Sequence, residues 1–177
     1  MIHSQFNSLN KDKPSIALVA QSIHQLQKAS YLQTKIDAEI DLIYIRRSES
    51  DDFLRKIAPI SLLLDDLNQL KNSIHQYTKL VFFSLYASYQ SAQCIECLDQ
   101  NGIDLFLIQE THSIPTHKGF HLGINFTPDL LFAASDEDKA GLAKLNIAPN
   151  KSIFSYGWMF QSNFYNWLSS INQTTSK

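Results

Sequence analysis

Short apolar runs alternate with amphipathic segments along most of the chain. Seven of these runs have the length and the branched or aromatic side chains of buried strands: 15–20, 41–45, 61–64, 80–85, 103–108, 130–133 and 152–155. The segments between most of them repeat their apolar positions every three or four residues, which is the period of a helix with one buried face. This alternation predicts an α/β fold, a three-layer Rossmann-like sandwich with six or seven mostly parallel strands.

Polar residues after the predicted strands indicate where helices begin. Ser22 is placed as an N-cap, and Ser135 with Asp138 has the spacing of a capping box. A further helix is predicted to start at Asp65 or Asp66. Its apolar positions would share one stripe: Leu67, Leu70, Ile74 and Tyr77.

Composition narrows the class of protein. A length of 177 residues predicts one domain, which we place at 14–177 after a polar, flexible tail at 1–13. The 15 basic residues against 17 acidic ones give no electrostatic reason to expect nucleic acid as a partner. No apolar run reaches the ~20 residues of a membrane span. Two cysteines without an export signal predict reduced thiols and a cytoplasmic location.

The segment 109–128 is the strongest pointer to function. Ligands of open parallel sheets bind outside the carboxyl ends of the strands, and this segment follows such an end. It is far longer than the usual connection of roughly 2–6 residues. It holds groups that transfer protons or let backbone approach a ligand: Glu110, His112, His117, Lys118, Gly119, His121 and Gly123. The alternative is a solvent-exposed polar loop that binds no ligand.

Metal and phosphate motifs are weak. Cys94 and Cys97 are spaced like zinc ligands, as are His117 and His121, but a complete predicted strand separates the two pairs. We therefore predict no metal, with both cysteines buried as packing residues. No glycine-rich phosphate loop is present, because the turn after the first strand reads Ala20-Gln21-Ser22. No cofactor is predicted, although a nucleotide could rest on a helix that begins at Ser88 or Ser135.

The segment 158–171 predicts an aromatic terminal helix. Its apolar stripe has the spacing of one buried face: Phe160, Phe164, Trp167, Leu168 and Ile171. We expect this stripe to pack on the sheet. Trp158 and Tyr165 lie partly outside the stripe, which leaves room for an interface with another chain.

Residues 103–157 carry a family resemblance. The run IDLFLIQETHS, followed by PDLLFAASDEDKAGLAKLNIAPNKSIFSYG, is similar in order and spacing to part of the amino-terminal domain of GT-B glycosyltransferases and of UDP-GlcNAc 2-epimerases. The resemblance implies that His112 and Glu110 lie at the floor of a cleft as catalytic residues. The binding residues predicted around them are Thr111, Ser113, His117, Lys118, Gly119, His121, Tyr86, Ser88 and Ser135.

This resemblance implies a glycosyltransferase-like protein of surface polysaccharide or glycan synthesis with a sugar or nucleotide-sugar ligand. Such enzymes bind the sugar nucleotide chiefly in a second Rossmann domain, so we expect the chain to act with a separate partner that binds it. Whether the chain is itself catalytic stays open. The alternative is a non-catalytic binding or assembly module that uses the aromatic helix as its interface, for example in a homodimer.

Overall fold

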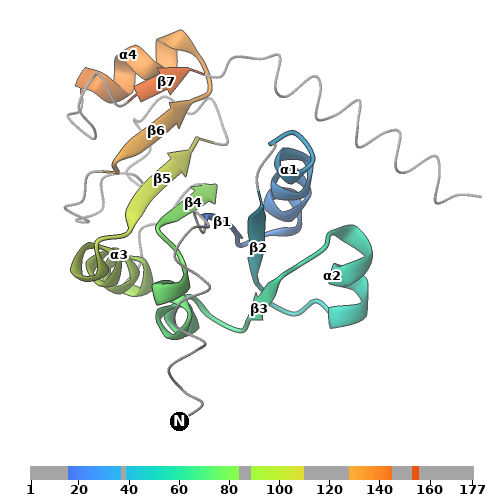
Figure 1. The fold of residues 1–177 in the computed structure, drawn as a ribbon. Helices are drawn as coiled ribbons and strands as arrows, with labels where there is room; N and C mark the ends of the chain where they lie inside the picture. The colour runs from blue at the N-terminus through green and yellow to red at the C-terminus, as the bar shows by residue number, and fades with distance from the viewer. Residues whose placement is uncertain (1–15, 37–38, 84–88, 110–127, 145–152, 156–177) are drawn as a thin grey trace, which may run out of the picture.

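The computed structural model describes residues 16–36, 39–83, 89–109, 128–144 and 153–155. Their strands form one seven-stranded sheet in the order β3-β2-β1-β4-β5-β6-β7, with every neighbouring pair parallel (Figure 1). The strands are β1 (Ile16–Ala20), β2 (Ile40–Ile45), β3 (Leu62–Leu64), β4 (Lys79–Phe83), β5 (Asp104–Ile108), β6 (Leu130–Ala133) and β7 (Ile153–Ser155). This is the Rossmann-like order, and it confirms the predicted fold class.

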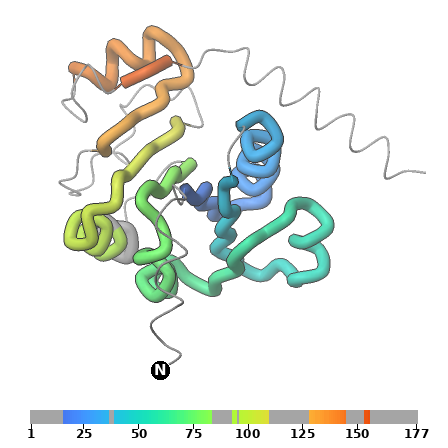
Figure 2. Tube along the Cα trace, viewed as in Figure 1, coloured from blue at the N-terminus to red at the C-terminus, as the bar shows by residue number. Residues whose placement is uncertain are grey.

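Helices cover the sheet on two faces, which we name the α1 face and the α3 face. On the α1 face lie α1 (Ile23–Gln33) and α2 (Asp51–Ile57), through Leu26 and Leu54. On the α3 face lie η2 (Leu67–Asn72), η3 (Ile74–Gln76), α3 (Tyr89–Asn101) and α4 (Asp136–Lys144). Figure 2 shows the two groups on opposite sides of the strands. None of the described helices is long and apolar enough to cross a membrane.

The face on which a connection lies depends on the direction in which that connection crosses the sheet. Connections that step toward β3 carry α1 and α2 and lie on the α1 face. Connections that step toward β7 carry η2, η3, α3 and α4 and lie on the α3 face. A single hand of crossover produces this division, because reversing the direction of travel moves the connection to the other face.

Most of the predicted elements and caps are confirmed. Ser22 caps α1 as predicted. In addition, Ser50 caps α2, and Gly102 ends α3 with a positive φ of 63°. One prediction is wrong in kind. The helix placed after Asp66 is two short 3₁₀ turns, although its four stripe residues are all buried as expected: Leu67, Leu70, Ile74 and Tyr77.

Candidate functional site

The carboxyl edge of the sheet holds the junction at which the strand order reverses. β1 is followed by α1 on one side, and β4 is followed by the chain that leads to α3 on the other. In doubly wound sheets, this junction between the first and fourth strands is where nucleotides and other ligands bind. A ligand at this junction would therefore contact the groups at the ends of β1 and β4.

A glutamine side chain occupies this junction. Gln25 is 0% exposed; its Nε2 donates a hydrogen bond to the Phe83 carbonyl at the end of β4, at 2.5 Å. Its Oε1 accepts a hydrogen bond from the backbone N–H of Gln21, just after β1, at 2.7 Å. The Ser22 hydroxyl accepts another from the N–H of Gln25, at 3.2 Å. Side chains therefore already accept hydrogen bonds from two N–H groups of this turn, those of Gln21 and Gln25.

A second glutamine fixes the ends of β5 and β6. Gln109 is 3% exposed, and its N–H donates to the Phe132 carbonyl at 2.8 Å. Its Oε1 accepts from the N–H of Ala134 at 3.1 Å. The segment with the predicted catalytic residues therefore starts from a rigid position on the carboxyl edge, one strand away from β4.

Most predicted site residues lie outside the described residues. Those are Tyr86, Ser88, Glu110, Thr111, His112, Ser113, His117, Lys118, Gly119 and His121. Ser135 is described, and it occupies the predicted N-cap position before α4. Its hydroxyl accepts from the N–H of Asp138 at 3.0 Å and donates to the Asp138 carboxylate at 2.8 Å. The structure thus gives Ser135 a role at the start of α4.

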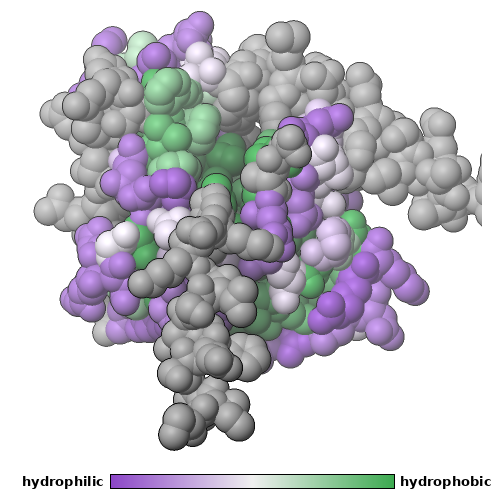
Figure 3. Space-filling view, in the orientation of Figure 1, coloured by the Kyte–Doolittle hydropathy of each residue, from purple (hydrophilic) through white to green (hydrophobic). Residues whose placement is uncertain are grey.

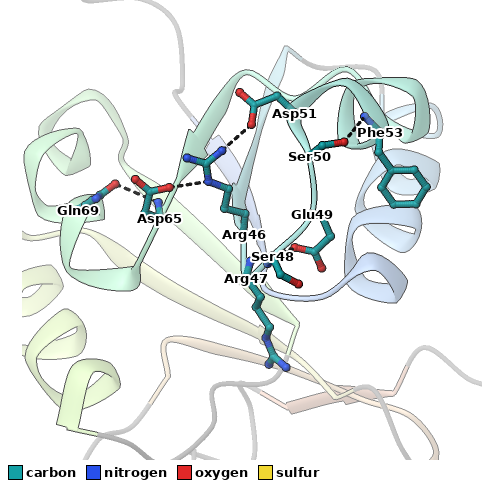
Figure 4. Close-up of polar contacts among 9 residues, drawn as sticks. All are labelled: Arg46, Arg47, Ser48, Glu49, Ser50, Asp51, Phe53, Asp65 and Gln69. Carbon is teal, nitrogen blue, oxygen red and sulfur yellow. Dashed lines mark hydrogen bonds and ion pairs between the residues drawn. The ribbon is translucent and has the colours of Figure 1, made fainter.

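The ends of β2 and β3 carry an ion cluster that the sequence analysis did not single out. Arg46 lies between Asp51 and Asp65, with an N···O distance of 2.5 Å to each (Figure 4). The hydrogen bond from Arg46 and its charge lower the pKa of Asp65. Arg47 points away from both carboxylates, and its guanidinium makes no ion pair with the described residues. The cluster ties the loop before α2 to the end of β3.

The cysteines have different surroundings. Cys94 is 1% exposed, and burial raises the pKa of its thiol to about 12. Cys97 is half-buried, and its Sγ accepts a 3.6 Å hydrogen bond from Asn101, so the prediction of two buried thiols is right for Cys94 alone. Within the described part of the chain, no three His, Cys, Asp or Glu side chains gather as a metal site.

The comparisons with known proteins support no family assignment. Neither a family model nor a curated protein matches the sequence. Among solved structures, the chain is similar to an imine reductase variant from Myxococcus stipitatus in complex with NAD⁺, at 11% identity and a TM-score of 0.34. The match covers 93% of this chain and 64% of that one. A likeness this distant says nothing of the ligand or activity of this chain.

Sequence reasoning missed the two glutamines that organise the carboxyl edge. Gln25 is a polar residue within an amphipathic helix, and the pattern of apolar positions does not show that such a residue is buried. Its partner Phe83 lies 58 residues away. A useful signal for Gln109 was its place directly after a predicted strand, at the edge where ligands bind.

Proposed function

We propose that the chain binds an acceptor sugar at the carboxyl edge beside β5 and acts as the acceptor-side half of a two-part glycosyltransferase. Glu110 and His112 are the proposed acid–base pair, and a separate partner binds the nucleotide sugar. The observation that carries this proposal is the pair of hydrogen bonds that hold Gln109 to Phe132 and Ala134.

Chain connectivity links that observation to the two candidates. Successive Cα atoms are ~3.8 Å apart, so Glu110 begins beside Gln109 and His112 lies within roughly 11 Å of it. The usual ligand position in this fold is the β1–β4 junction, and in this proposal both residues lie at it. In glycosyl transfer the imidazole of His112 would accept the proton of the acceptor hydroxyl, and Glu110 would orient the ring.

The order of the elements is compatible with the segment on which the proposal rests, and it is also the general order of a Rossmann-like sheet. β5 precedes the motif with His112, and Asp129 stands directly before β6, where its carboxylate accepts from the N–H of Leu105 at 2.8 Å. A helix led by Ser135 then precedes β7. The three strands and the Ser-led helix thus follow the order of the similar family segment.

Ligand-observed NMR with a panel of nucleotide sugars and free sugars tests the proposal. We expect saturation transfer to at least one free sugar, at least tenfold weaker binding in His112→Ala, and a smaller loss in Glu110→Gln. His75→Ala is the matched control, because His75 is exposed on η3, which leads into the opposite end of β4. Absence of binding, or equal loss in the two histidine variants, would contradict the proposal.

The assembly module stays as the second candidate. Its interface would be the aromatic segment 158–171, and the exposed side chain of Phe154, just before that segment, favours this candidate. A partner chain seated there would make the protein a scaffold. Binding of a second copy would raise the sedimentation coefficient with protein concentration.

A further inference from the structure

Among the described residues, helices cover half of the sheet on only one face. In β1, β2 and β4 nearly every residue is buried, as in a sheet with helices on both sides. In β5 and β6 burial alternates along each strand. Residues on the α3 face, such as Leu107 and Leu131, are fully buried. Residues on the α1 face are partly exposed, and Phe154 of β7 is 49% exposed.

At one end of the α1 face Asp104 of β5 pairs with Lys79 of β4, and the other residues that β5, β6 and β7 present there are apolar and lie side by side. Strand register forms two rows on the α1 face: Val81-Phe106-Leu130, and Phe83-Ile108-Phe132-Phe154. Four residues of these rows line a groove of about 360 Å³: Val81, Phe106, Ile108 and Phe132. Leu32 of α1 and Ile36, which follows that helix, line its other side. Figure 3 shows the apolar patch between β6 and α1. A face of this composition needs a cover, since monomeric proteins rarely expose large apolar patches.

Topology indicates which segment of this chain covers the face. The connection from β5 to β6 steps toward β7, and every described connection in that direction lies on the α3 face. The segment after β7 differs from these connections. No later strand among the described residues requires it to cross the sheet in that direction. It starts at the carboxyl edge, and only residues 156–157 separate β7 from the aromatic segment. α4 already packs on the α3 face of β7, which leaves the α1 face.

We propose that residues 158–171 dock as a helix in this groove, beside α1. The apolar stripe would face the two rows of the sheet through Phe160, Phe164, Trp167, Leu168 and Ile171. A helix of ~14 residues is about 21 Å long, close to the ~17 Å of a five-residue strand. The segment therefore matches the face in length and in apolar character, and it begins at an edge of the sheet beside that face.

Tryptophan fluorescence tests the proposal, because both tryptophans of the chain, Trp158 and Trp167, lie in this segment. In the full chain with Trp158→Phe, the remaining Trp167 is in the stripe. Its emission should be blue-shifted and protected from acrylamide at all protein concentrations. Introducing Phe154→Asp beside the groove, next to Phe132 in the second row, should shift the emission to the red and raise quenching severalfold.

Phe53→Asp provides a matched control. Phe53 is also 49% exposed, but it lies on α2, and its replacement should leave the emission of Trp167 unchanged. Solvent-exposed emission of Trp167 in the parent chain would overturn the proposal. So would an emission that Phe154→Asp does not move, which would assign another segment to the face. A blue shift that vanishes on dilution would assign the groove to a second copy of the chain.

Discussion

At the scale of single residues, Gln25 is the side chain on which the carboxyl edge depends most. Replacing it with Ala leaves the Phe83 carbonyl and the Gln21 N–H without their partner in a buried place. At ~1–3 kcal/mol for each unsatisfied group, we expect Gln25→Ala to lower the free energy of unfolding by about 2–6 kcal/mol. Urea titration measures the loss. The exposed Gln76 supplies the control, and Gln76→Ala should stay within about 0.5 kcal/mol.

Buried tyrosines predict how stability depends on pH. Burial, with a contribution from Glu49, raises the pKa of Tyr44 to about 12, and burial raises that of Tyr77 as well. Above about pH 10 the unfolded chain loses these phenolic protons while the folded chain keeps them, so stability falls as pH rises. The urea midpoint should therefore decrease from about pH 9 to about pH 11. Tyr44→Phe should reduce that decrease, and an unchanged slope would contradict the role of Tyr44.

At the scale of elements, the N-cap of α4 is a local source of stability. Ser135→Ala removes the hydroxyl that binds the N–H of Asp138, and we expect a loss of ~1 kcal/mol in the free energy of unfolding. Ser73 is the matched control, because it precedes η3 and its side chain makes no cap hydrogen bond. If Ser135→Ala and Ser73→Ala have equal midpoints, the cap does not stabilise the domain.

The elements also show how far the sequence alone could lead. Strands, caps and the stop at Gly102 follow from local side-chain preferences, so they could be predicted. The 3₁₀ turns after Asp66 could not, because Leu67 and Leu70 are three residues apart, a spacing shared by 3₁₀ and α-helices. The contact of Gln25 with Phe83 depends on the order of the strands, which no local pattern contains.

At the scale of the molecule, the sheet has two unlike halves. From β3 to β4, helices cover both faces, and Gln25 fills the junction at the carboxyl edge. From β5 to β7, the described helices cover the α3 face alone. The segments that carry the candidate chemistry and the aromatic stripe both leave the sheet from this second half, so function is expected there.

The last prediction concerns whether the terminal segment belongs to the folded unit. If its stripe packs in the groove beside α1, Phe164→Ala removes a buried ring and should cost ~3–5 kcal/mol of the ~5–15 kcal/mol that stabilise a domain. The urea midpoint should fall strongly, with the same slope. Trp158 lies partly outside the stripe, so Trp158→Ala should change stability by about 0.5 kcal/mol or less. A midpoint for Phe164→Ala equal to that of the unmodified chain would show that the groove is not covered by this segment.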